Sequence, residues 1–126
     1  MREIKFRAKA LFNGTIGSNK WIYGSNINIA PHGDTYRLYI NGIRCDYKTL
    51  GQYTGLRDCN DEDIYEGDIV TGSFMGNVFT EQVTWNVRRA GFIAGYTIDM
   101  GNYDGKSELE IIGNIYDNPE LREDKK

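Results

Sequence analysis

The densest group of side chains that could do chemistry is an acidic segment, residues 58–68, in the middle of the chain. Asp58, Asn60 and Glu62 have the spacing of the first three oxygen ligands in an EF-hand calcium loop. The pattern then fails, because Asp63 stands where the loop needs glycine and Ile69 stands where it needs a bidentate glutamate. Two interpretations stay open: a looser magnesium site of two carboxylates, serving a metal-assisted enzyme, and a solvated hairpin loop.

A row of cations near the N-terminus is a candidate binding surface. Lys5, Arg7 and Lys9 alternate with apolar residues, so an extended strand would point all three charges to one side. Such a row could follow a phosphate backbone. It could equally be a solvated strand face, or could meet the acidic segment of a neighbouring subunit.

A second basic candidate lies in the C-terminal half. Arg88 and Arg89 end an alternating stretch, with Trp85 and Tyr96 close by in the sequence. Cations beside aromatic rings can stack on nucleic-acid bases or clamp an acidic partner. The alternative is a charged hairpin tip that discourages edge-to-edge pairing. With Lys5, Arg7 and Lys9, these four residues complete the candidate partner-binding set.

The usual catalytic arrangements are missing from the sequence. No Gly-x-Gly-x-x-Gly, P-loop or Gly-x-Ser-x-Gly pattern occurs. His32, the only histidine, lies in a turn sequence, and Cys45 and Cys59 are far apart and expected to be free thiols. A zinc site would need more cysteine and histidine than the chain has. We therefore expect no cofactor and no enzymatic activity.

Composition is that of one soluble domain with segregated charge. The 126 residues are 40% hydrophobic, and no apolar run approaches the roughly 18 residues that span a bilayer. The first residues lack the apolar core of a signal peptide, so a cytoplasmic protein that does not enter membranes is expected. Residues 1–50 carry a net charge of +5 and residues 51–70 carry −5. This segregation favours a homo-oligomer or an internal electrostatic seam over free nucleic acid, since nucleic-acid-binding domains usually have a pI above about 9 and this chain has one near 5.1.

Alternating apolar and polar residues between turn signals predict an all-β, mainly antiparallel protein. Asn41-Gly42 is the strongest hairpin signal, and Gly24 is a candidate bulge within its stretch. Asn118-Pro119 predicts the start of a short C-terminal helix, with Asn118 as its N-cap. Within a single domain, 1–126, we expect an N-terminal β-sheet region at 1–50 and a small SH3-like barrel at 64–118. The predicted strands are 3–10, 20–29, 36–40, 43–47, 69–75, 82–87, 92–98 and 109–116.

Five segments, in order and covering nearly the whole chain, resemble the YopX family. They are MREIKFRA (1–8), WIYG (21–24), GQYTGLRD (51–58), IYEGDIV (64–70) and IIGNIYDNPEL (111–121). One departure is the run at 59–62, which is Cys-Asn-Asp-Glu where the family tends to have Lys-Asn-Gly-Lys, so no charge-based role is carried over to it.

The resemblance implies a phage or prophage protein of Gram-positive bacteria that acts inside the host cell. It also implies a β-rich fold with an SH3-like barrel, a barrel-entry turn at 65–68 and a capped last helix at Asn118. It brings no established activity and so no catalytic residues. Three hypotheses follow: a non-enzymatic accessory protein that binds a host or phage protein or itself, a nucleic-acid-binding protein, and, less favoured, the metal-assisted enzyme.

Overall fold

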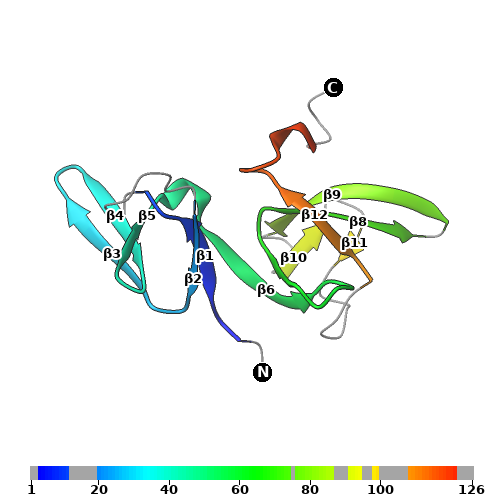
Figure 1. Ribbon diagram of the computed structural model, residues 1–126, viewed down its shortest axis with the longest axis horizontal. Coiled ribbons are helices and arrows are strands. Elements are labelled where there is room, and N and C mark those ends of the chain that lie inside the picture. Colours follow the sequence, from blue (N-terminus) through cyan, green and yellow to red (C-terminus); the bar gives the residue numbers. More distant parts are fainter. Residues whose placement is uncertain are drawn as a thin grey trace. The chain divides into compact units, whose positions relative to one another are not determined.

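The protein is described from a computed structural model, in which residues 3–11, 20–74, 76–86, 91–94, 98–99 and 108–121 are described. The chain divides into two compact units, Met1–Tyr53 and Thr54–Lys126. Both are built of β-strands (Figure 1), and the strand pairs with a defined register are antiparallel. The predicted all-β, antiparallel fold is confirmed. The predicted ranges 1–50 and 64–118 stay predictions as domain boundaries.

Unit 1 is organised around a strand that is paired on both edges. This strand, β1, pairs with β2 on one edge and with the start of β6 on the other. Just after β1, Ala10 forms an isolated bridge to Cys45, which connects β1 to the three-stranded sheet β3-β4-β5. The elements of this unit are β1 (Phe6–Lys9), β2 (Trp21–Gly24), β3 (Ile27–His32), β4 (Thr35–Ile40), β5 (Ile43–Cys45), the 3₁₀ turn η1 (Tyr47–Thr49) and the first half of β6 (Gly51–Arg57).

Alternate side chains along these strands point into the core of unit 1. Its fully buried members are Ala8, Leu38, Ile40 and Cys45, and the half-buried side chains around them are Phe6, Ile22, Ile27 and Leu50. Because the side chains of a strand alternate between faces, the neighbours of the core residues in sequence lie on the outward face. The charged residues of β1 therefore lie on the face opposite this core, where Arg7 is nevertheless buried.

Two turn predictions in unit 1 have different outcomes. Asn41 and Gly42 have positive φ values of 54° and 83°, which confirms the predicted tight hairpin between β4 and β5.

The single extended stretch predicted for 20–29 is wrong, because β2 ends at Gly24 and β3 starts at Ile27. Gly24 is not a bulge but a close approach. The Asn41 amide donates to the Tyr23 carbonyl at 3.0 Å, and a Cβ at Gly24 would meet the same amide at 2.4 Å.

Unit 2 is a strongly curved antiparallel sheet that forms a half-barrel (Figure 1). Its strand order is β11-β10-β9-β8-β12, with an irregularity in β12 between Ile111 and Gly113. Its core consists of Leu56, Ile64, Val70, Val83, Phe92, Ala94 and Leu109, with Phe79 and Ile111 packed against it. The elements are the second half of β6, β7 (Asp63–Tyr65), β8 (Asp68–Phe74), β9 (Asn77–Asn86), β10 (Gly91–Ala94), β11 (Ile98–Asp99), β12 (Glu110–Asn114) and the 3₁₀ turn η3 (Pro119–Leu121).

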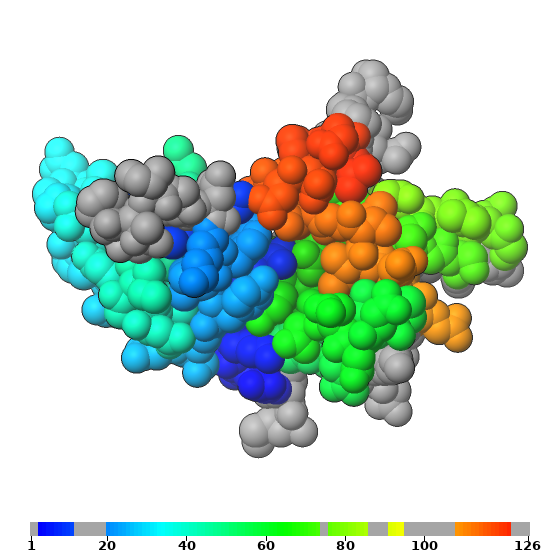
Figure 2. Space-filling view, viewed as in Figure 1, coloured from blue at the N-terminus to red at the C-terminus, as the bar shows by residue number. Residues whose placement is uncertain are grey.

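The far ends of β8 and β9 extend beyond their other partners. Residues 72–74 of β8 pair with 77–79 of β9, whereas β10 and β12 pair only with the opposite ends of these two strands. The hairpin tip is therefore a two-stranded arm of unit 2, seen in yellow-green in the space-filling view (Figure 2). Val78 on this arm is 79% exposed.

The predicted C-terminal helix is a single 3₁₀ turn, closed by the Leu121 N–H donating to the Asn118 carbonyl at 3.0 Å. Asn118 has the predicted N-cap position, directly before the turn, but its side chain does not cap the turn's own N–H groups. The Asn118 side-chain oxygen accepts from the Asn114 N–H behind it, at 3.3 Å, and so closes the turn that ends β12. Across the described residues, no helix has the length and apolar character to span a membrane.

Candidate functional site

The cations of β1 lie over aromatic rings in unit 1. The Lys5 Nζ is 4.7 Å from the centre of the Tyr53 ring. The Arg7 guanidinium carbon and the Lys9 Nζ lie 4.4 Å and 5.5 Å from the centre of the Trp21 ring. Each distance is within the roughly 6 Å at which a cation is attracted by the π-face of a ring. The three charges are thereby held in fixed positions along one strand.

Strand pairing explains why these groups meet. Lys9 is directly opposite Trp21 in the β1–β2 register, and directly opposite pairs share a face of the sheet. The three cations are not equally accessible, however: Arg7 is 5% exposed, whereas Lys5 and Lys9 are half-buried. Lys5 also forms an ion pair with Glu3, at 3.5 Å. Arg7 therefore orients Trp21 from within the unit, and the two lysines are the charges that a partner can reach.

The second predicted group of cations lies mostly outside the described residues. Arg88, Arg89 and Tyr96 are not among the residues that the structure describes. Trp85 is described, and it is 44% exposed on β9. Its ring meets Phe92 edge to face, with centroids 5.0 Å apart and planes at 75°. Trp85 thus covers one edge of the unit 2 core and keeps part of its ring accessible.

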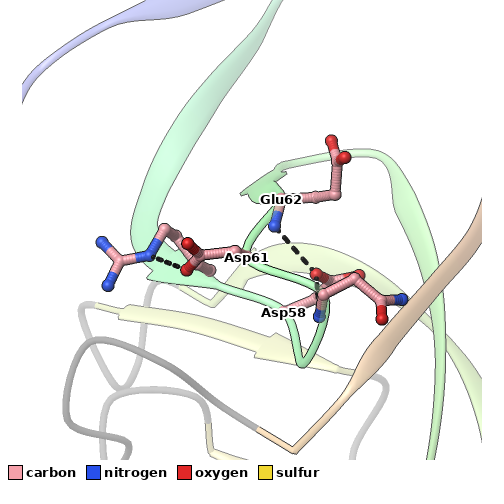
Figure 3. Close-up of polar contacts among 5 residues, drawn as sticks. Asp58, Asp61 and Glu62 are labelled. Atoms are coloured by element: carbon pink, nitrogen blue, oxygen red, sulfur yellow. Dashed lines mark hydrogen bonds and ion pairs between the residues drawn. The ribbon is translucent and has the colours of Figure 1, made fainter.

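The acidic segment is built around a buried carboxylate, Asp58. Asp58 is only 1% exposed. Its Oδ1 accepts the backbone N–H groups of Asn60 at 2.8 Å and Glu62 at 2.9 Å, and its Oδ2 accepts that of Ile111 at 3.0 Å. Figure 3 shows the side chain turned inward beneath the loop, where it receives the Glu62 amide. This carboxylate therefore joins the loop to β12, 53 residues further along the chain.

A second buried carboxylate, Asp68, closes the next turn. It is 2% exposed, and its Oδ2 accepts the Tyr65 N–H at 2.7 Å. Gly67 between them has a φ of 98°, a conformation that favours glycine. The interpretation of the whole acidic segment as a solvated loop is thus wrong for Asp58 and Asp68, because backbone amides replace water around both carboxylates.

Two of the other acidic side chains fit the solvated interpretation. Asp61 and Glu62 are exposed, and Asp61 pairs with Arg57 at 2.7 Å (Figure 3). Among the described residues, no three His, Cys, Asp or Glu side chains are grouped so that they could hold a metal ion. The sequence held a signal for the bond from Asn60, since an Asp at the start of a tight turn commonly accepts the amide two residues later. It held none for the bond from Ile111, which lies 53 residues away.

Both cysteines are free thiols, as predicted, but their surroundings differ. Cys45 is 2% exposed in the unit 1 core, where its thiol donates to the Ile43 carbonyl at 3.3 Å. Burial raises the pKa of the Cys45 thiol above its ordinary value, against a smaller lowering effect of a backbone hydrogen bond. Cys59 is exposed in the acidic segment.

Comparison with known proteins assigns the family. The family model described as YopX protein matches residues 5–123, nearly the entire chain. The chain belongs to the YopX family. The YopX chain is also similar in fold to the crystal structure of protein EF1440 from Enterococcus faecalis, at 22% sequence identity and a TM-score of 0.53. That similarity covers 98% of this chain and all of the other. No curated protein matches the sequence.

The geometry of the acidic segment generates a stability prediction. Replacing Asp58 with alanine removes the acceptor of three backbone N–H groups, so we expect the free energy of unfolding to fall by about 2–4 kcal/mol. Chemical denaturation followed by circular dichroism measures this. The matched control is Glu62→Ala, an exposed side chain in the same loop, which should change stability by less than about 0.5 kcal/mol. Equal effects of the two substitutions would contradict a structural role for Asp58.

The two thiols should also differ in reactivity. In the native protein we expect Cys59 to react with iodoacetamide at least about tenfold faster than Cys45, because burial excludes the reagent and disfavours the thiolate. Mass spectrometry of the labelled peptides gives both rates in one sample, and denatured protein serves as the control in which the rates converge. Comparable native rates would show that Cys45 is not held in the core.

Proposed function

We propose that this YopX protein is a non-enzymatic accessory protein of a phage or prophage, which acts by binding in the cytoplasm of the bacterial host. The observation that carries the proposal is the row of β1 cations held over Trp21 and Tyr53. Charges fixed in this way lose little side-chain entropy when a partner docks, so they form a prepared surface for an anionic partner.

The buried carboxylates support a binding role over a catalytic one. A metal-assisted enzyme would need two free carboxylates in the acidic segment. Two of its carboxylates are already used by the backbone: Asp58 accepts three N–H groups, and Asp68 accepts that of Tyr65. The charged groups that remain accessible in the described part of unit 1 include Lys5 and Lys9, whose chemistry is recognition of anions.

The accessible lysines of β1 give the first test. On a heparin column, used as a generic polyanion, the double variant Lys5→Gln/Lys9→Gln should elute at lower salt than the wild type, because two fixed positive charges are removed. The matched control, Lys48→Gln/Arg57→Gln, removes the same charge from exposed positions outside β1. The proposal would be contradicted if the β1 variant eluted with the wild type, or if both variants shifted equally.

Self-association is a second candidate function, favoured by apolar exposure on the β3–β4 hairpin. Ile29 is 59% exposed and Tyr36 is 63% exposed, and Pro31 beside them is also exposed. By register, all three lie on the same side of the hairpin as the buried Leu38. The apolar face of the hairpin thus continues past the core, and we propose that a second copy of the chain covers it.

Sedimentation velocity over a range of concentrations tests self-association. We expect the wild type to form a dimer or larger oligomer, and Ile29→Glu/Tyr36→Glu to stay monomeric because a charge would have to be buried in the dimer interface. A control double variant, Tyr47→Glu/Val78→Glu, places the same two new charges at other exposed positions and should leave the oligomer intact. A wild type that is monomeric at all concentrations would refute this candidate.

A further inference from the structure

The sheet β3-β4-β5 has an outward face that the sequence interpretation did not consider. Leu38, Ile40 and Cys45 point into the unit 1 core, so the residues between them point to the opposite side. Strand register aligns these outward residues in rows across the sheet. Asn28, Tyr39 and Arg44 form one row, and Ala30 and Arg37 form the next.

Tyr39 therefore has two arginines as neighbours on this face. Arg44 is its directly opposite neighbour on β5, and Arg37 is two residues away on the same strand and the same face. Arg37 Nη2 lies 2.8 Å from His32 Nε2. The Nε atoms of both arginines are buried without a hydrogen-bond partner, and neither guanidinium is paired with a carboxylate among the described residues. Both side chains are half-buried overall, so the accessible part of each guanidinium can donate to an anion even though its Nε cannot.

A pocket adjoins this face and shares Tyr39 with it. Its volume is about 410 Å³, within the range of roughly 300–1,000 Å³ that is usual for small-molecule sites. It is lined by Asn26, Ile27, Asn28, Tyr39 and Gly42. Asn28 and Tyr39 share the outward side of the hairpin. Their amide and phenol groups offer both donors and acceptors, which suits the edge of a nucleobase, and the Tyr39 ring offers a surface on which the base can stack.

This face is continuous with the cation row of β1. The Leu11 N–H donates to the Arg44 carbonyl at 3.0 Å, and the Asp46 N–H donates to the Lys9 carbonyl at 2.8 Å. Ala10 and Cys45 form the bridge between the strands and both point into the core. Lys9 and Arg44, their neighbours in sequence, therefore share the outward side, and among the described residues only Asp46 adds a negative charge where the two strands meet.

We propose that the outward face of unit 1 binds single-stranded nucleic acid, with Arg37 and Arg44 on the phosphates, Tyr39 against a base and the pocket around that base's edge. The inference rests on the proposed function, since both require an anionic partner, and it names that partner. A single strand fits better than a duplex because the bases of a duplex are stacked away from a side pocket, while an unpaired base can enter it.

Fluorescence anisotropy with a labelled oligothymidine of about 12 nucleotides tests the inference at a series of salt concentrations. We expect Arg37→Gln/Arg44→Gln to weaken binding about tenfold or more, and to reduce the slope of log affinity against log salt by about 1.4, or about 0.7 for each phosphate that is no longer neutralised. Tyr39→Leu should weaken binding about fivefold or more with no change in slope, because it removes stacking and no charge. Lys48→Gln/Arg57→Gln is the control of equal charge.

The outcomes separate this inference from the function on which it rests. Affinity of Arg37→Gln/Arg44→Gln equal to that of the control, or absence of oligothymidine binding by the wild type at low salt, would overturn the inference. Equal affinity for a duplex of the same length would overturn it too, because the base would have no role. In each case the heparin behaviour of Lys5→Gln/Lys9→Gln still decides the proposed function independently. If the double arginine variant does not fold, Arg44→Gln alone and Tyr39→Leu carry the test.

Discussion

The double-sided pairing of β1 is the constraint on which unit 1 depends. This one strand hydrogen-bonds to β2 and β6 and bridges to β5, so its register sets the position of every other strand in the unit. The alternation of its side chains then puts apolar residues on one face and cations on the other. Ala8 is fully buried in the core, while Arg7 stacks on Trp21 at the opposite face. A one-residue slip of β1 would exchange these faces and bury cations among aliphatic side chains.

Unit 2 has a different constraint, that of the two polar connections before and after β7. The segment between β6 and β8 has few apolar residues of its own, and two aspartates hold it in place. Asp58 connects the loop to β12, and Asp68 closes the turn that enters β8. Acidic residues that resemble a ligand set in the sequence are therefore part of the framework.

Local signals in the sequence predicted the fold well, and long-range contacts account for what was missed. The Asn41-Gly42 hairpin and the alternation in β1 are encoded by adjacent residues. The burial of Asp58 depends on Ile111, and that of Arg7 depends on a ring on another strand, so neither could be deduced from spacing alone. The sequence did not predict Arg37 and Arg44 as binding residues, because each stands singly among apolar neighbours. Only the register of β4 and β5 makes both of them neighbours of Tyr39 on one face.

The most direct test of the account is an amide NMR titration of the isotope-labelled protein with oligothymidine. The account predicts that the shifting resonances belong to β1, β4 and β5, with Lys9, Tyr39 and Arg44 among the largest changes, while the acidic segment around Asp58 stays unchanged. Shifts confined to residues of unit 2, or no shifts at low salt, would contradict the claim that the outward face of unit 1 is the binding surface.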